Sequence, residues 1–318
     1  MSNITVIENF LLLGFSGGRE LQILHFVIFL AMYLAILMGN ILIITLIVVS
    51  KHLHFPMYFF LVNLSVLDLG STSVIIPNSM ANSFKNIRLI SFSECVRQMF
   101  FSVLFLSSDL FLLTVMAYDR YVAICQPLHY ASMMRWSRCI QMAGGAWMAG
   151  FLNGVLHIGT VFSLPFCSNV INQFFCEISH LVKISCSDSS RSELWALFFS
   201  AFLALGCFVL IVMSYVQIFT TVFRMPSMEN RQKAFSTCIP HIIVVSTFVG
   251  TSLFTHLVPT SNSSYNLNEV LAVLYTVVPP MLNPIIYSMR NKDVKAAFWN
   301  LLGFILGKKN KRLAPINP

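Results

Sequence analysis

The sequence predicts an all-α membrane protein with seven transmembrane helices in one domain. Hydrophobic residues make up 57% of its 318 positions and charged residues only 10%, and the mean hydropathy is +0.76. A soluble domain of this size could not cover so apolar a chain with polar surface. Apolar runs of about 20 residues, the length that crosses a bilayer core of about 30 Å, recur along nearly the whole chain with short polar breaks.

The crossings follow from reading the apolar runs against these breaks. We expect them near residues 22–49, 57–82, 96–122, 138–162, 195–223, 235–258 and 268–289. A shorter stretch at 291–302 has lysines on one face and Val294, Phe298 and Leu302 on the other, which predicts an amphipathic helix along the membrane surface. The expected parts are an extracellular N-terminal tail at 1–21, a seven-helix domain at 22–290, and the amphipathic helix with a basic cytoplasmic tail at 291–318.

Basic residues assign the two sides of the membrane. Seven crossings place the termini on opposite sides, and the side richer in Lys and Arg is cytoplasmic. Fourteen of the twenty Lys and Arg residues fall on the side of the C-terminus. We therefore expect a multi-pass plasma-membrane protein with an extracellular N-terminus. The net charge of +8 does not indicate nucleic-acid binding, because the basic residues lie at helix ends rather than in a patch with exposed aromatics.

The first twenty residues lack a basic start and a cleavage site after an apolar stretch, so we expect no removable signal peptide.

The outer side carries two kinds of modification site. A sequon at 3–5 makes Asn3 a candidate for glycosylation. Four cysteines fall on the outer side, where oxidation is permitted, and they allow three disulfide pairings. They are Cys95, Cys167, Cys176 and Cys186.

Three acidic residues lie within or at the edge of predicted crossings, where an ionised carboxylate is costly unless compensated. Asp119 adjoins Arg120 at the cytoplasmic end of the third crossing, which indicates either a helix-end charge pair or a switch. Asp68 and Asp109 have no such neighbour and are expected to face the bundle. Two buried carboxylates close together repel, so either one stays protonated or a cation lies between them. Further oxygen donors are Asn40, Ser65 and Asn283.

Several motifs, taken together, point to a family. Residues 116–125, MAYDRYVAIC, resemble the signature of vertebrate odorant receptors. The family order continues with GN at 39–40, PMYFFL at 56–61, PLHY at 127–130, SY at 214–215, KAFSTC at 233–238 and PMLNPIIYS at 280–288. The resemblance therefore covers nearly the whole chain.

This resemblance implies a rhodopsin-like G-protein-coupled receptor that couples to the olfactory stimulatory G protein and raises cyclic AMP. It implies that Asp119 restrains Arg120 until the sixth helix swings outward and frees the arginine to contact the G protein. Tyr215 and Tyr287 match the switch tyrosines of the family.

The resemblance also selects one disulfide pairing and one ion site. The implied disulfides are Cys95 to Cys176 and Cys167 to Cys186, the first pinning the second outer loop across the third helix. The implied ion is sodium, the only bound cofactor we expect, held by Asp68 and Asp109. At position 109 the family usually has Glu, and we expect the shorter Asp side chain either to weaken the site or to recentre it.

A ligand pocket is implied between helices three, five, six and seven, beneath the second outer loop. Its residues here are Ser102, Val103, Leu106, Ser107, Phe199, Leu203, Val249, Ser252, His256 and Thr276. Apolar walls with a few hydroxyls, one imidazole and no fixed charge predict a small volatile ligand with one weak polar group. Val249 stands where the family commonly has a tyrosine, and His256 would attract an acid if it became cationic.

Other functions fit the sequence less well. A retinal pigment needs a lysine in the seventh crossing, and 268–289 contains none. A transporter or channel is the alternative of a different class, but the crossings show no internal repeat. An enzyme is not expected, because no nucleophile, base and orienting acid share one membrane depth. A receptor of the same fold for a non-odorant metabolite outside the nose stays open.

Overall fold

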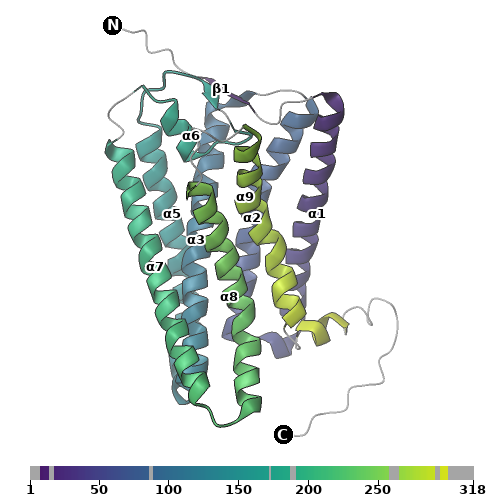
Figure 1. Cartoon of the computed structure of the whole chain (residues 1–318), viewed down its shortest axis with the longest axis vertical. Coiled ribbons are helices and arrows are strands. Elements are labelled where there is room, and N and C mark those ends of the chain that lie inside the picture. Colours follow the sequence, from purple (N-terminus) through teal and green to yellow (C-terminus); the bar gives the residue numbers. More distant parts are fainter. Residues whose placement is uncertain are drawn as a thin grey trace.

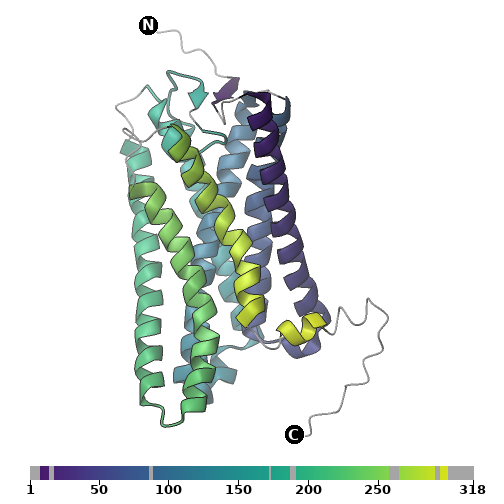
Figure 2. The same cartoon turned by 45° about the vertical axis from the view of Figure 1, so that its right-hand side comes forward.

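Seven long α-helices run side by side as a bundle (Figures 1 and 2) in the computed structural model, which describes residues 8–13, 18–85, 89–171, 173–186, 191–257, 265–290 and 294–299. They are α1 (Arg19–Val49), α2 (Pro56–Lys85), α3 (Phe92–Cys125), α5 (Trp136–Val161), α7 (Arg191–Arg224), α8 (Met228–Leu257) and α9 (Tyr265–Arg290). Each matches one predicted crossing, so the prediction of an all-α seven-helix bundle is confirmed.

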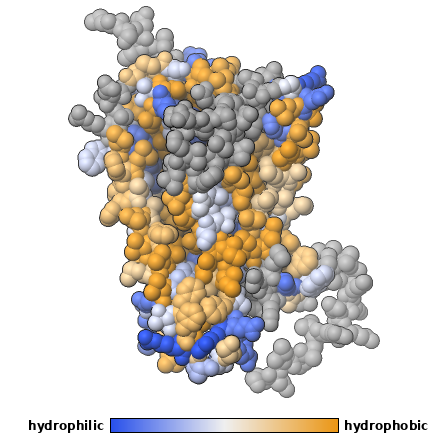
Figure 3. Space-filling view, in the orientation of Figure 1, coloured by the Kyte–Doolittle hydropathy of each residue, from blue (hydrophilic) through white to orange (hydrophobic). Residues whose placement is uncertain are grey.

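The surface of the bundle is that of a membrane protein. Among the described residues, α1, α2, α3, α7 and α8 are each long and apolar enough to cross a bilayer, and α9 has a shorter apolar part at Val273–Tyr287. Apolar side chains form a band between the two ends, and polar ones gather at the end where α7 turns into α8 (Figure 3). On α7, Trp195 is 74% and Phe202 72% exposed. Lipid is the environment in which such a surface is stable.

A small lid closes the other end, here called the sheet end. Strand β1 (Asn9–Leu12) pairs antiparallel with β2 (Leu89–Ser91) and parallel with β3 (Val170–Ile171). The lid is completed by the short helix α6 (Ile178–Lys183). Its disulfides join Cys95 to Cys176 and Cys167 to Cys186, which confirms the implied pairing. The first ties the start of α3 to the loop that leads into α6.

The backbones of α3 and α5 approach closely at two glycines of α5. A Cβ atom at Gly150 would lie 2.1 Å from Ser108 Oγ and 2.5 Å from the carbonyl oxygen of Leu104, and one at Gly154 would lie 3.0 Å from the ring of Phe100. Small residues allow such close packing between membrane helices, where dispersion contacts replace the hydrophobic effect. This contact makes α3 and α5 one rigid pair.

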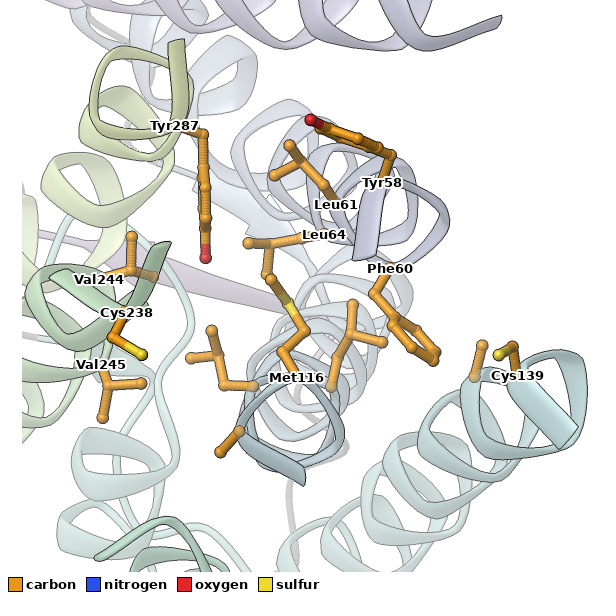
Figure 4. Packing of buried hydrophobic residues seen from close by; sticks show 14 of the residues in the cluster. Tyr58, Phe60, Leu61, Leu64, Met116, Cys139, Cys238, Val244, Val245 and Tyr287 are labelled. Atoms are coloured by element: carbon orange, nitrogen blue, oxygen red, sulfur yellow. The ribbon is translucent and has the colours of Figure 1, made fainter. Parts of the chain in front are cut away.

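The largest buried cluster lies toward the end opposite the lid and joins most of the helices. The ring of Tyr287, on α9, lies between Val244 of α8 and Leu64 of α2, with Met116 of α3 nearby (Figure 4). Interfaces of this kind fix helix positions through close packing. The cluster therefore links the ends of α8 and α9 to the α2–α3 core.

A short helical segment at 294–299 follows α9 and runs across the end of the bundle (Figures 1 and 2). Val294 is fully buried, Phe298 packs against the main cluster and Trp299 is 63% exposed. This part of the predicted amphipathic helix is helical and two-faced, whereas 291–293 and 300–318 lie outside the described residues. Asn3 and its sequon also lie outside them.

The α3–α5 contact makes a testable prediction. Gly150→Ala should lower the thermal midpoint of the detergent-solubilised receptor strongly, because the new methyl meets a backbone carbonyl and overpacking costs about 1–3 kcal/mol. The matched control is Gly145→Ala on the same helix, since a Cβ there meets nothing within 4 Å. Size-exclusion chromatography of heated samples measures both midpoints. Equal midpoints for the two variants would contradict this packing.

Candidate functional site

A cavity of about 500 Å³ lies inside the bundle beneath the lid. Its walls come from α2, α3, α7, α8 and α9, and its roof from the segment 175–183, which includes α6. Gln98 of α3 supports the roof: its Oε1 accepts from the backbone N–H of Cys176 at 2.9 Å, and its Nε2 donates to the carbonyl of Val74 at 3.3 Å. The roof is thus held by a disulfide and a hydrogen bond to the same helix.

Five of the ten residues of the predicted pocket line this cavity. Three come from α3, one from α8 and one from α9: Ser102, Val103, Leu106, Ser252 and Thr276. The hydroxyl of Ser102 donates to the carbonyl of Gln98 at 2.7 Å, so its oxygen remains available as an acceptor. Three of the four α3 residues of the predicted pocket therefore line the cavity.

Four other residues of the predicted pocket lie elsewhere. The hydroxyl of Ser107 faces α5, where it accepts from Asn153 Nδ2 at 2.9 Å. Phe199 is 53% exposed on the bundle surface, and Leu203 lines a separate cavity among α3, α5 and α7. Val249 packs against the main buried cluster. The side chain of His256 lies outside the described part of the chain.

The expectation that no fixed charge lines the cavity is wrong. Glu177 and Lys183 lie in its roof, and Asp68 and Asp109 line its deep end. The roof residues were missed because a loop closed by disulfides has no helical periodicity to follow. Burial lowers the pKa of His180 in the roof; the negative charge of Glu177 opposes this shift, and the positive charge of Lys183 adds to it.

At the deep end of the cavity, carboxylate and amide groups from three helices converge. Asn283 of α9 donates through Nδ2 to both carboxylate oxygens of Asp68, at 3.0 and 3.2 Å. Asp109 is 8% exposed, and its Oδ1 has no hydrogen-bond partner among the residues described. Hard oxygen donors of this kind suit an alkali or alkaline-earth cation. Among all the residues that the structure describes, no three His, Cys, Asp or Glu side chains are arranged to hold a metal ion.

A second polar site lies at the far end of α3. Asp119 Oδ2 is 3.7 Å from Arg120 Nη2, and Asp119 Oδ1 accepts from the hydroxyl of Tyr130 at 2.9 Å. Tyr130 begins the short helix α4 (Tyr130–Met133), so the loop after α3 folds back on the acid. Asp119 is 2% and Arg120 7% exposed. The sequence indicated the ion pair but not the tyrosine, although PLHY was among the motifs.

Tyr215 and Tyr287 lie near this site in different surroundings. The Nε2 of His241, on α8, faces the carbonyl of Leu113 at 3.1 Å and must donate to it, which leaves Nδ1 to accept from the Tyr215 hydroxyl at 2.7 Å. This bridge joins α3, α7 and α8. The Tyr287 hydroxyl is buried, and no described residue is its hydrogen-bond partner.

Comparisons with known proteins decide what kind of molecule carries these sites. The profile of a family described as olfactory receptor matches residues 29–303. Human olfactory receptor 14I1 is 49% identical over 302 residues, covering 95% of this chain and 97% of the relative. Human olfactory receptor 14J1 is 47% identical over 303 residues, covering 95% and 94%. The chain belongs to the olfactory receptor family.

The fold of this olfactory receptor agrees with a solved structure. A crystal structure of squid rhodopsin matches it with a TM-score of 0.69 at 19% identity, over 92% of this chain and 88% of the rhodopsin chain. The olfactory receptor is therefore a multi-pass membrane protein with the seven-helix receptor fold. Like its family, it is a signalling receptor for small odorants that acts through G proteins and is not an enzyme.

The contact between Tyr130 and Asp119 makes a second prediction. Tyr130→Phe removes a hydrogen bond to a charged group, worth about 1.5–3 kcal/mol, and leaves Arg120 less restrained. Ligand-independent G-protein activation per surface receptor should rise severalfold. Tyr33→Phe is the control, because it loses a hydroxyl contact to Ser73 far from Asp119. Equal basal activity in wild type and Tyr130→Phe would count against the restraint.

Proposed function

We propose that this olfactory receptor binds a small, mostly apolar volatile odorant beneath its disulfide-held roof and activates the olfactory stimulatory G protein, raising cyclic AMP. The observation that carries the proposal is the cavity beneath the roof, whose size suits a small molecule. Relatives named as olfactory receptors over 95% of the chain support the odorant class.

The cavity favours a ligand with an apolar body and one polar group. Val103, Leu106, Val244 and Phe248 form an apolar middle between a charged roof and an acidic deep end. Apolar walls bind a hydrocarbon body, while a hydroxyl or carbonyl pairs with polar groups at one end. A bare amine or acid would lose its hydration over the apolar middle, and only a head group in contact with the charged side chains of the roof or the deep end would regain that free energy, whereas a neutral polar group needs no such pairing. Alcohols, aldehydes, ketones and esters are therefore the favoured classes.

The sheet end is proposed to face outward and the α7–α8 turn to face the cytoplasm of the plasma membrane. Both disulfides lie at the sheet end, and disulfides persist in oxidising surroundings. Arg224, Arg231 and Lys233 lie at or beside the α7–α8 turn, as the positive-inside rule requires of a cytoplasmic loop.

Signalling is proposed to begin at α8, which contributes both to the cavity wall and to the Tyr215–His241 bridge. A ligand that binds better to an outward setting of α8 shifts the receptor toward that setting. The movement separates α8 from α3, and Arg120 leaves Asp119 to contact the G protein. Tyr215 and Tyr287 are proposed to stabilise the freed arginine.

A sodium ion is proposed to be held at the deep end of the cavity by Asp68 and Asp109. The unpartnered Oδ1 of Asp109 and the carboxylate of Asp68 fit a small hard cation. When bound, sodium would offset the repulsion between the two carboxylates. Asn283 orients Asp68 through both carboxylate oxygens.

The sodium proposal predicts a salt-specific stabilisation. At a sodium concentration of about five times the dissociation constant, wild type should gain about 1 kcal/mol over N-methylglucamine at equal ionic strength. Asp109→Asn should abolish this gain, because it removes one of the two charges, whereas Asp109→Glu should keep it. Thermal midpoints in detergent measure the effect. A sodium-dependent rise in Asp109→Asn equal to that of wild type would refute the site.

The proposed function is tested by cyclic AMP responses to a panel of neutral volatiles in transfected cells. Leu106→Trp should raise the effective concentration of an active odorant at least about tenfold, because one pocket methylene is already worth 10-fold or more. Leu205→Trp is the control, since Leu205 is 60% exposed on α7. Arg120→Ala should abolish the response at normal surface expression.

Three outcomes would overturn parts of this proposal. Full signalling by Arg120→Ala would remove the arginine from the coupling step. An unchanged response of Leu106→Trp would place the ligand outside the cavity. Activation by non-volatile metabolites alone would make the protein a receptor of the same fold for a different signal.

A further inference from the structure

A buried polar chain crosses from α7 through α5 to α3, outside the ligand cavity. Glu193 Oε1 lies 2.9 Å from His157 Nδ1, and His157 Nε2 lies 2.9 Å from Ser200 Oγ. Ser200 donates to Asn153 Oδ1 at 2.8 Å, and Asn153 Nδ2 donates to Ser107 Oγ at 2.9 Å. Four consecutive contacts thus join the three helices.

Both ionisable members of this chain are enclosed by protein. Glu193 is fully buried and His157 is 2% exposed. The second carboxylate oxygen of Glu193 accepts from the hydroxyl of Thr160, so both carboxyl oxygens have partners. An acid buried in a membrane protein is tolerated when it is paired in this way, and such groups usually have a function. The proposed signalling mechanism uses neither residue.

The directions of the hydrogen bonds follow from the donors available. Ser200 has one proton and gives it to Asn153 Oδ1, so His157 Nε2 must donate to Ser200 Oγ. The remaining contact, between His157 Nδ1 and Glu193 Oε1, holds a single proton shared by the ring and the carboxyl group. The pair is therefore neutral as a whole. From His157 onward, each residue donates a hydrogen bond to the next, through Ser200 and Asn153 to Ser107.

This chain connects α7 to the rigid α3–α5 pair. Asn153 lies between Gly150 and Gly154, the two glycines at which α5 approaches α3 most closely. Its two amide atoms bond Ser200 on one side and Ser107 on the other. Packing of α5 against α3 fixes the position of Asn153. The hydrogen bond from Ser200 to Asn153 therefore holds α7 in place relative to α5.

The same face of α7 reaches the ligand cavity. Glu193, Leu197 and Ser200 are spaced four and three residues apart, which places them along one side of a helix. Leu197 lines the cavity, whereas Phe199 points away and is 53% exposed. Each residue turns a helix by about 100°. Leu197 and Phe199 therefore point about 200° apart, and turning α7 by even one residue would move Leu197 away from the cavity.

We propose that Glu193 and His157 are positioning residues for ligand recognition, which hold α7 through Ser200 and Asn153 in the rotation that presents Leu197 to the cavity and leaves Phe199 in lipid. Buried polar pairs can select one register among similar apolar packings. The inference rests on the proposed function, since it makes this chain a determinant of which odorants fit.

Cysteine labelling tests the rotation without ligand or G protein, so the result is independent of whether the proposed function holds. Leu197→Cys and Phe199→Cys are introduced separately, and membranes are treated with 2-hydroxyethyl methanethiosulfonate. Mass spectrometry then gives the labelling rate at each position. Only the thiolate reacts, so a cysteine in the cavity should label about tenfold faster than one in lipid.

The ratio of the labelling rate at Leu197→Cys to that at Phe199→Cys is then measured in variants that break or preserve the chain of hydrogen bonds. Glu193→Leu and Ser200→Ala each remove a link, and the ratio should fall toward one. Glu193→Gln is the matched control: its amide nitrogen donates to His157 Nδ1 and its oxygen accepts from Thr160, so every direction is kept. This variant should stay within about twofold of the parent ratio, because the hydrogen-bond geometry is unchanged.

Each result decides the proposal. A ratio that stays high in Glu193→Leu or Ser200→Ala would overturn it, as would equal labelling of the two positions in the otherwise unchanged receptor. Loss of the ratio in Glu193→Gln would also overturn it, because the hydrogen bonds survive that change. If Glu193→Leu fails to fold, Ser200→Ala gives the answer alone, since it removes only one hydroxyl.

Discussion

Lipid offers no hydrogen-bond partners, so a polar side chain inside this receptor is stabilised when the protein itself supplies its partner. Asp68 finds Asn283 on another helix, Asp119 finds Tyr130, and Tyr215 finds His241. These contacts lie at different depths and join different helices. Apolar packing alone permits many helix rotations of similar free energy, whereas a buried polar pair permits few, because each alternative leaves a group unsatisfied. The polar pairs therefore select the arrangement within which the apolar core packs.

The position of the cavity depends on which helices pack tightly against α3 and which do not. At Gly150 and Gly154, α3 and α5 are packed backbone to backbone, which leaves no space for a ligand between the two helices at those positions. The cavity lies among α2, α3, α7, α8 and α9, beneath a roof that Cys95 and Gln98 tie to α3. The α3 helix thus serves as the fixed wall, and the roof cannot move away from it without breaking covalent or hydrogen bonds.

Much of this could be predicted from the sequence, and the rest could not for identifiable physical reasons. The helices follow from apolar runs, because the bilayer thickness sets their length. On α3, helical spacing from the signature at Arg120 predicts three residues that line the cavity, but it also chose Ser107, which contacts Asn153 of α5 instead. On α7 the same reasoning chose Phe199 and Leu203, which lie outside the cavity. The rotation of α7 is tied to contacts with α5, and no periodicity within α7 contains that information.

The cavity and the Tyr215–His241 bridge lie at different depths of the bundle, but they share neighbouring residues of the same helices. On α8, Val244 lines the cavity and His241 joins Tyr215 only three residues away, a rise of about 4.5 Å. On α3, Leu113 lines the cavity with its side chain and accepts from His241 with its carbonyl. A ligand that displaced Val244, as the proposed function requires, would therefore act within one helical turn of the bridge that holds α8 to α3. Coupling between the cavity and this bridge needs no long chain of residues. One rigid helical turn is sufficient, provided that it can take two alternative positions.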